Sequence, residues 1–403
     1  MTEFKDVPKS DTAKDKILAY SVSIPVGVTQ SYTVEFKYAN DESVDQSDDM
    51  GKKLSGTLFI TEGTEDIYAG YEEGTLGYQI MGDNPTRSTW SNNNNGTNDF
   101  ATPLTATTTG TLFTGTESIA GGTPKEVYYY AGNTTNNWVK FANFYWRIIR
   151  TNHDGSIKLL YAGTSPDTTS GNIGESKFNP SNNSPKYVGY KYGEETSLDT
   201  IRNNTTNSAI KTYVDNWYKN NLTAYTKYLS NDAVYCNDRN LASGQTYSTT
   251  SSFNYAPYER IYTNKQPTYN CTNMSDAFSV NNTSAKLNYP VGLMSIDELS
   301  YAGGQAGKSL TTPYAWYYTN ANGESITGIA PSWALSPYRW LGSSSIVWRV
   351  NGSDFPGRLV DGYVEYSMAV RPSVSLSSCN LISRGDGSPE NPYEIYTGNG
   401  VCE

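Results

Sequence analysis

Few residues of this chain have the chemistry for acid–base or nucleophilic catalysis. Its one histidine, His153, stands in "NHDG", where Asp154 and Gly155 predict a tight turn. We expect this histidine to be solvated at the tip of the turn. A Ser-His-Asp set cannot be assembled without it, and no G-x-S-x-G motif occurs. The sequence therefore predicts no catalytic residues and no enzymatic activity.

Four cysteines form two pairs along the chain. Cys236 and Cys271 flank a tyrosine-rich segment, and Cys379 and Cys402 bracket the C-terminal tail. None has the C-x-x-C spacing of a zinc or redox site. Of three possible pairings, we expect disulfides 236–271 and 379–402, the alternative being four buried thiols in a cytosolic protein. Disulfides favour an exported protein.

A cation site would need clustered oxygen ligands. The stretch "GDGSPENP" places Asp386, Glu390 and Asn391 close together. The same residue types also form turns, and "YEIY" follows as an expected strand. We expect the turn, and hence no metal and no cofactor.

Ligand recognition is the remaining function to consider, and residues 338–366 are the candidate stretch for it. This stretch mixes aromatic and arginine side chains with serine and glycine, as binding hot spots and antibody combining sites do. The expected ligand-binding residues are Tyr338, Arg339, Leu341, Ser343, Ser344, Arg349, Ser353, Asp354, Phe355, Arg358, Asp361, Tyr363, Glu365 and Tyr366.

The alternative for each aromatic residue of this stretch is a place in the core. Trp340 and Trp348 are the best candidates, because "IVWRV" alternates as a strand does. For single residues, contact with a ligand and burial remain equally open. Arg371, in "VRP", is expected to be a buried structural arginine.

The elements that must position this stretch are strands and two helices. Ser208 is expected to cap a helix that ends near Leu222, and Ser295 and Glu298 form a capping box that begins a second helix. Strands are expected on both sides of the turn at His153. The fold class is therefore α+β and β-rich.

Three regions are expected along the chain. Residues 1–63, with alternating strands in 18–38, predict a β-sandwich-like spacer module. Residues 64–124 are rich in Gly, Thr and Asn and predict a connector. Residues 125–403 form the ligand-binding domain.

Charge and hydropathy limit the partners. The net charge of −10 excludes a nucleic-acid-binding surface of the usual basic kind. No apolar run reaches the roughly 18 residues that span a bilayer. The N-terminus lacks the hydrophobic core of a signal peptide, so we expect that any leader, or any anchor to a membrane or cell wall, has been removed from this chain.

Several motifs are similar to those of a known family. "NFYWRIIRTNHDGSIKLL", "YPVGLMSIDELSYAG", "WALSPYRW", "VRPSVSL" and "GDGSPENPYEI" resemble, in this order, exported proteins of gut bacteria and their phages. Those proteins carry a C-terminal C-type lectin-like domain related to the formylglycine-generating-enzyme fold. The resemblance covers about residues 125–397 and implies the same fold here.

In one branch of that fold, the variable proteins of diversity-generating retroelements, a stretch near the C-terminus is rewritten by adenine-directed mutagenesis. Residues 338–366 have the residue types that such rewriting produces, between a Trp-Ala-Leu-Ser-Pro entry and a Val-Arg-Pro exit. The resemblance implies a variable protein with an extracellular location, on a cell surface or a phage particle.

Together these observations predict an exported binding protein whose ligand is a protein or glycan on another cell or a host surface. Two alternatives remain. One is a structural subunit of a pilus or surface layer. The other is an enzyme of the formylglycine-generating type, or a degenerate relative, which would need reactive cysteines.

Overall fold

The computed structural model describes residues 68–88, 100–101, 110–310 and 315–398. The chain divides into two compact units at Gly70/Tyr71. The expected spacer module, residues 1–63, lies outside the described residues, as does Cys402. Among the described residues, no helix is long and apolar enough to cross a membrane.

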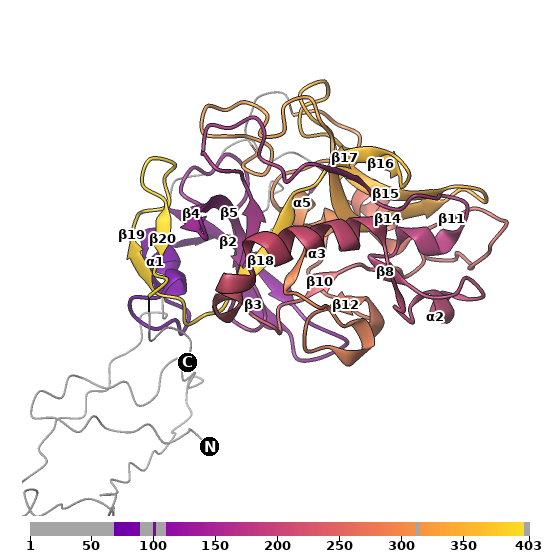
Figure 1. Ribbon diagram of the computed structural model, residues 1–403, viewed down its shortest axis with the longest axis horizontal. Helices are drawn as coiled ribbons and strands as arrows, with labels where there is room; N and C mark the ends of the chain where they lie inside the picture. The colour runs from indigo at the N-terminus through magenta and orange to yellow at the C-terminus, as the bar shows by residue number, and fades with distance from the viewer. Residues whose placement is uncertain (1–67, 89–99, 102–109, 311–314, 399–403) are drawn as a thin grey trace, which may run out of the picture. The chain divides into compact units, whose positions relative to one another are not determined.

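The second unit is a strand-rich α+β fold with two main sheets (Figure 1). The larger sheet follows the order β1-β2-β3-β5-β4-β20-β19, and a branch from β5 continues through β6 and β18 to β13. Its strands are β1 (Thr86–Ser88), β2 (Thr111–Glu117), β3 (Lys125–Tyr129), β4 (Trp138–Phe141), β5 (Phe144–Thr151), β6 (Ile157–Tyr161), β13 (Val291–Leu293), β18 (Pro372–Leu376), β19 (Ile382–Arg384) and β20 (Tyr393–Ile395).

The second sheet carries the expected recognition stretch. It follows the order β16-β15-β14-β17-β7, with β11 paired to β14. Its strands are β7 (Glu175–Lys177), β11 (Phe253–Asn254), β14 (Ser332–Trp340), β15 (Ser345–Val350), β16 (Leu359–Tyr363) and β17 (Ser367–Ala369). Two short pairs join β8 (Lys191–Tyr192) to β9 (Thr206–Asn207) and β10 (Tyr235–Cys236) to β12 (Ala277–Phe278).

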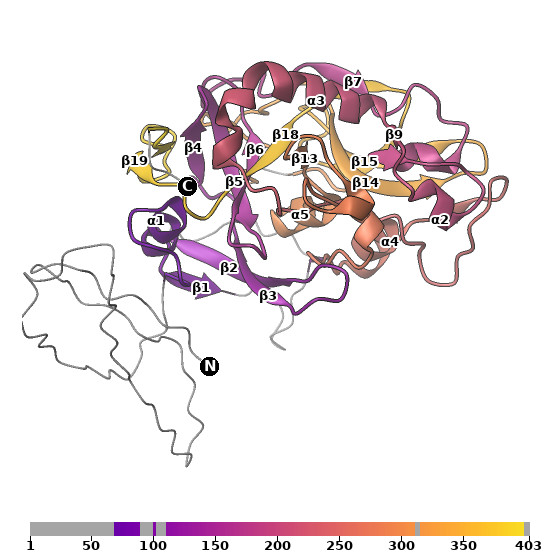
Figure 2. The same ribbon diagram turned by 60° about the horizontal axis from the view of Figure 1, so that its bottom comes forward.

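Helices connect the two sheets. The helices are α1 (Leu76–Asp83), α2 (Leu198–Ile201), α3 (Ala209–Asn221), α4 (Ala256–Tyr258), which continues into the π-helix η4 (Glu259–Asn264), and α5 (Ile296–Tyr301). Helix α3 contacts β13 of the larger sheet and β7 of the second. It runs along both sheets in Figures 1 and 2, while α5 lies near the centre of the unit and contacts β14.

Both expected helices form, and their local signals explain where they begin. Ser208 Oγ accepts a hydrogen bond from the backbone N–H of Lys211 at 3.1 Å. The capping box of α5 is complete: Ser295 Oγ accepts from Glu298 N at 3.1 Å, and Glu298 Oε2 accepts from Ser295 N at 2.9 Å. Such caps satisfy N–H groups that the first helical turn leaves free.

Residues 111–117, which the sequence assigns to a connector, form a strand of the larger sheet. β2 pairs antiparallel with β3 from Phe113↔Tyr129 to Glu117↔Lys125. Helix α1 also belongs to the second unit, which begins at Tyr71. The second unit therefore begins well before residue 125, the boundary expected from the sequence.

The first helix of this unit, α1, lies beside the strand pair β19–β20 near its C-terminal end. Leu76 N donates to Asn380 O at 2.8 Å, and Ile382 N donates to Gly74 O at 3.1 Å. Figures 1 and 2 show α1 next to β19 at one end of the unit. The strands β15 and β16 lie in the other sheet, away from that end.

Residues 315–320 form a buried segment outside the sheets and helices, and two arginines hold it. Arg371 Nε donates to Tyr161 O at 3.1 Å, and its Nη1 donates to Tyr317 O. Arg147 Nη1 donates to Thr319 O at 3.2 Å, with its guanidinium 4.2 Å from the Trp138 ring centroid. Buried carbonyl groups outside helices and sheets need such donors. The expected structural role of Arg371 is confirmed.

Candidate ligand-binding surface

The aperiodic stretch 338–366 is an antiparallel meander of β14, β15 and β16. β15 pairs with β14 on one side and with β16 on the other, in register from Ile346↔Tyr363 to Val350↔Leu359. Nearly all of β14 and β15 is buried. Because both faces of these strands are covered, their residues show no polar–apolar alternation.

Five of the expected ligand-binding residues line one concave surface, here called the hollow. It has a volume of about 380 Å³ and lies between the β15–β16 loop and the segment just before β14. The expected residues in its lining are Arg349, Asp354, Phe355, Arg358 and Asp361. Its size falls in the range of about 300–1,000 Å³ that is usual for binding sites.

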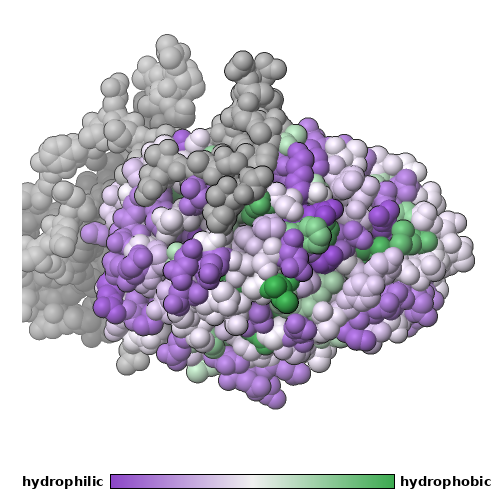
Figure 3. Space-filling model, turned by 90° about the horizontal axis from the view of Figure 1, so that it is seen from above, coloured by the Kyte–Doolittle hydropathy of each residue, from purple (hydrophilic) through white to green (hydrophobic). Residues whose placement is uncertain are grey.

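The sequence argument missed the other wall of the hollow. Ile329 and Pro331 line it from the segment before β14, together with Asn351, Gly352 and Val360. Ile329 is 73% exposed, the highest value among the exposed large apolar residues of the described chain, and Phe355 is 50% exposed. The signal for Ile329 was its position in "TGIAPS", an apolar residue amid turn residues. Figure 3 views the molecule from the side of β16 and β17, and apolar residues stand out there singly among hydrophilic ones.

Main-chain contacts fix the loop 351–358 that forms the rim of the hollow. Ser353 N donates to Gly328 O at 2.8 Å, Asn351 N to Arg358 O at 2.9 Å, and Leu310 N to Pro356 O at 2.7 Å. A Cβ on Gly352 would lie 2.5 Å from the backbone of Ile329. The loop therefore packs backbone against backbone at this glycine.

The side chains at the tip of this loop take no part in those contacts. Ser353, Asp354 and Phe355 are exposed, and within the described residues their side chains make no hydrogen bond or ion pair. The only aromatic contact of Phe355 there is with the Arg358 guanidinium, 5.6 Å from the ring centroid. The conformation of the loop thus depends little on which side chains stand at its tip.

Arg349 is held in place across the sheet. A Cβ at Gly362 would lie 2.9 Å from both Arg349 Cδ and Trp333 Cζ3, so the arginine stem and the indole occupy the space over this glycine. Arg349 Nε donates to the backbone oxygen of Asp361 at 2.7 Å, and Nη1 donates to Asn351 Oδ1. Burial lowers the pKa of Arg349, Asp361 opposes this shift, and Arg358 adds to it.

The remaining expected residues lie off the hollow. Tyr338 is 5% exposed, and its ring packs edge-on against Trp348 at 4.5 Å and Tyr258 at 4.9 Å. The structure thus places Tyr338 in the core beside Trp340 and Trp348, the two tryptophans weighed as core candidates. The others are Arg339 in β14, Leu341, Ser343 and Ser344 in the β14–β15 turn, Ser353 on the rim loop, Tyr363 at the end of β16, and Glu365 and Tyr366 after it.

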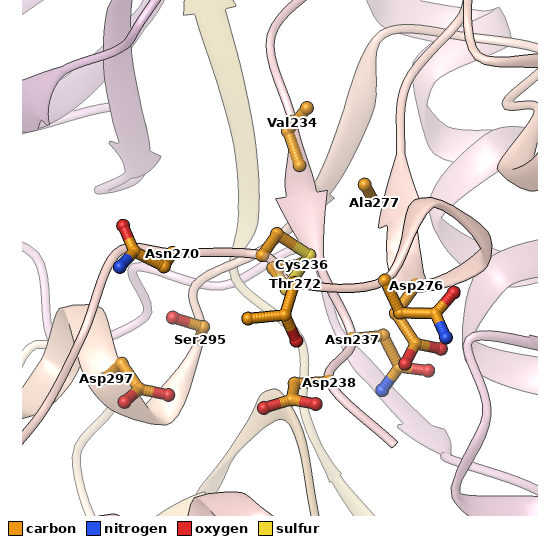
Figure 4. The surroundings of a disulfide bond; sticks show 12 residues. Val234, Cys236, Asn237, Asp238, Asn270, Thr272, Asp276, Ala277, Ser295 and Asp297 are labelled. Atoms are coloured by element: carbon orange, nitrogen blue, oxygen red, sulfur yellow. A yellow bond between two sulfur atoms is a disulfide. The ribbon is translucent and has the colours of Figure 1, made fainter. Parts of the chain in front are cut away.

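A second concave feature is a closed cavity beside the disulfide. Its volume of about 20 Å³ admits roughly one water molecule. The bond between Cys236 and Cys271, with Cα atoms 5.8 Å apart, confirms one expected disulfide. Figure 4 shows the surroundings of this disulfide, in which Asp238 and Asp297 are labelled. Cys379 is also disulfide-bonded, and its expected partner lies outside the described residues.

Paired charges surround this closed cavity. Arg150 lies 2.8 Å from Glu117 and 3.0 Å from Glu298, and Lys158 lies 2.7 Å from Glu298. Arg260 pairs with Asp238 at 2.7 Å and with Asp297 at 2.8 Å. These ion pairs link α5, β5 and the segments that carry the disulfide.

His153 lies at the β5–β6 turn, as expected, but its side chain is partly buried and held by Glu117 and is not fully solvated. Its backbone N–H donates to Glu117 Oε2 at 2.6 Å, and its Nδ1 lies 3.2 Å from the same oxygen. Burial would raise the pKa of Glu117, but Arg150 and His153 lower it to about 2. The hydrogen bond to Glu117 raises the pKa of His153. This histidine therefore stabilises the β5–β6 turn.

The turn of Asp386 is closed by hydrogen bonds within it. Ser388 N donates to Asp386 Oδ1 at 2.9 Å, and Asn391 N donates to Ser388 Oγ at 3.1 Å. The expected strand follows as β20. No group of three or more His, Cys, Asp or Glu side chains suited to a metal ion occurs in the described part of the chain.

The chain matches no protein-family model, no curated protein and no solved structure with which it was compared. Its function is therefore inferred from the hollow and the loop that forms its rim.

Proposed function

We propose that the protein is an exported, non-enzymatic binding protein, and that the hollow with its rim is its recognition surface. The domain would be C-type lectin-like, and residues 338–366 would be its variable region. The observation that carries the proposal is the attachment of loop 351–358 by main-chain hydrogen bonds, while the exposed side chains of Ser353, Asp354 and Phe355 make no hydrogen bond or ion pair with any described residue. A scaffold of this kind keeps its shape when its tip residues change.

The residue types at the hollow support binding. Arginine and aromatic side chains contribute most of the free energy at protein interfaces, and Arg349, Arg358 and Phe355 gather here with an exposed Ile329. The buried Tyr338, Trp340 and Trp348 would serve as the rigid base beneath them. Recognition would then need no cofactor, and no chemical step would follow.

The rival enzymatic reading finds less support in the described residues. They contain no free cysteine, because Cys236, Cys271 and Cys379 are all disulfide-bonded. The only histidine is engaged by Glu117. The disulfides also favour export, since cytosolic thiols stay reduced. The ligand would be a protein or glycan on another cell.

Sequencing of the gene in many individuals of one population tests the proposal. We expect substitutions concentrated in the codons for residues 341–366, at adenines, with the codons for Trp340, Ile346 and Trp348 unchanged. A near-copy of this segment beside a reverse-transcriptase gene would identify the source of the changes. Substitutions no more frequent in these codons than in those for β5 and β6 would refute the variable surface and favour a structural subunit.

A display library provides a second test. Randomising Ser353, Asp354 and Phe355 should leave most variants folded, as measured by protease resistance of the displayed chain. Randomising the buried Ile346, Val347 and Trp348 is the matched control and should leave few. Equal losses in the two libraries would contradict a rim held by its backbone.

A further inference from the structure

Two guanidinium groups at the hollow have no carboxylate partner within the described residues. Arg349 donates only to neutral acceptors, the backbone oxygen of Asp361 and the side-chain amide oxygen of Asn351. Arg358 makes no side-chain hydrogen bond or ion pair with any described residue, and its Nε is buried. Several other arginines of the unit do have carboxylate partners: Arg260 contacts two, and Arg384 contacts Glu394.

The register of the second sheet places the Asp361 carboxylate on the other face. Asp361 lies opposite Trp348, whereas Arg349 lies opposite Val360. Directly opposed residues share a face, and successive residues alternate. Asp361 thus contributes its backbone oxygen to the side of Arg349. Asp354 and Asp361 both belong to the lining of the hollow, but neither forms an ion pair with Arg349 or Arg358, so both guanidinium groups keep N–H donors for an anionic ligand group.

Apolar side chains line part of the hollow between these charges. Ile329, Pro331 and Val360 belong to its lining, with the ring of Phe355 at its rim. The rest of the lining is polar, and the side-chain oxygen of Asn351 already accepts from Arg349. An apolar side chain of a ligand can bury its surface against Ile329, Pro331 and Val360, which favours binding.

We propose that the hollow binds a carboxylate of a protein ligand together with the apolar side chain beside it. The carboxylate lies between Arg349 and Arg358, and the apolar side chain lies between Phe355 and Ile329. Paired guanidinium groups suit a carboxylate because their N–H donors match its two oxygens. This inference rests on the proposed binding function and specifies the chemistry of its ligand.

The test uses small probes with the full chain and ligand-observed NMR. The probes are N-acetyl-phenylalanine, N-acetyl-phenylalanine amide, glucuronate and inorganic sulfate, each at up to about 10 mM, a range in which weak single contacts are measurable. We expect N-acetyl-phenylalanine to bind at least about tenfold more tightly than its amide, because the amide lacks the charge. We expect glucuronate and sulfate to bind more weakly than the acid.

Three variants locate the binding. Arg358→Gln and Phe355→Ser should each weaken N-acetyl-phenylalanine at least about fivefold, without a change in the melting temperature that would indicate misfolding. The matched control is Arg384→Gln, an exposed arginine on β19 that is remote in the fold, and it should bind as the unaltered protein does.

The outcomes separate this inference from the proposed function. Equal binding of acid and amide, or an unchanged affinity in Arg358→Gln, would overturn the carboxylate site. Glucuronate binding more tightly than N-acetyl-phenylalanine would overturn the choice of a protein ligand. If no probe binds, the inference is wrong, whereas the variable surface still stands or falls by the sequencing of residues 341–366.

Discussion

Replacing Trp348 and Phe355 one at a time tests the division between scaffold and recognition surface. The two residues are only seven positions apart, on β15 and its following loop. Trp348 is 0% exposed and packs 4.5 Å from the Tyr338 ring, whereas Phe355 is 50% exposed. The two aromatic residues should therefore differ strongly in what they contribute to stability.

The magnitudes follow from burial. Removing a fully buried tryptophan typically lowers the free energy of unfolding by about 3–5 kcal/mol, so Trp348→Ala should fall in that range. Burying a phenylalanine completely stabilises by about 1.5–3 kcal/mol, and half of that leaves about 1 kcal/mol for Phe355→Ser. The main-chain bonds of the loop do not depend on the Phe355 side chain.

Urea unfolding followed by far-ultraviolet circular dichroism measures both values in the full chain with its disulfides intact. Tyr396→Ser is the matched control, since Tyr396 is a similarly exposed aromatic residue outside the hollow. A loss of about 3 kcal/mol or more in Phe355→Ser would place that ring in the core. A loss below about 1 kcal/mol in Trp348→Ala would refute the scaffold role of β15.

Three further predictions concern the parts that hold this surface. The double variant Cys236→Ala/Cys271→Ala should lose about 4 kcal/mol in urea unfolding, because the bond spans 35 residues. The pKa of Glu117 lies at about 2, below its usual value near 4.5, so its stabilising effect is complete above about pH 4.5 and is lost as the pH falls toward 2. Glu117→Gln should therefore flatten the decline of the melting temperature in acid. Gly362→Val should lower the melting temperature by overpacking, at a cost of about 1–3 kcal/mol, and should weaken ligand binding by displacing Arg349.

Local signals predicted helices α3 and α5 and the β5–β6 hairpin from sequence, but not α1, α2 or α4. The caps at Ser208 and Ser295 and the positive φ of Gly155 act within a few residues, so spacing alone reveals them. The disulfide between Cys236 and Cys271 followed from the pairing of cysteines along the chain.

The meander of β14 to β16 was harder to predict. Strands that are covered on both faces lose the alternation by which a strand is recognised, and β14 is buried at eight of nine positions. The recognition stretch was found by residue type, which cannot separate the buried Tyr338 from the exposed Phe355. That separation is set by contacts between distant segments.

The rest of the site depends on contacts far apart in the sequence. Ile329 reaches the hollow because Gly328 accepts a hydrogen bond from Ser353, across 25 positions of the chain. Glu117 meets Arg150 and His153 across 33 and 36 positions. No local pattern signals such pairs, so the sequence analysis placed His153 in solvent.

The adjacency of α1 and β19 bears on how this unit could be used. A domain whose first and last segments are hydrogen-bonded to each other can be spliced between two points of a longer polypeptide without stretching either join. The flanking polypeptide segments would then join the unit at the end where α1 and β19 lie. β15 and β16 lie away from that end. Such a unit could be transplanted whole into another chain, and we expect residues 71–403 to be the piece to move.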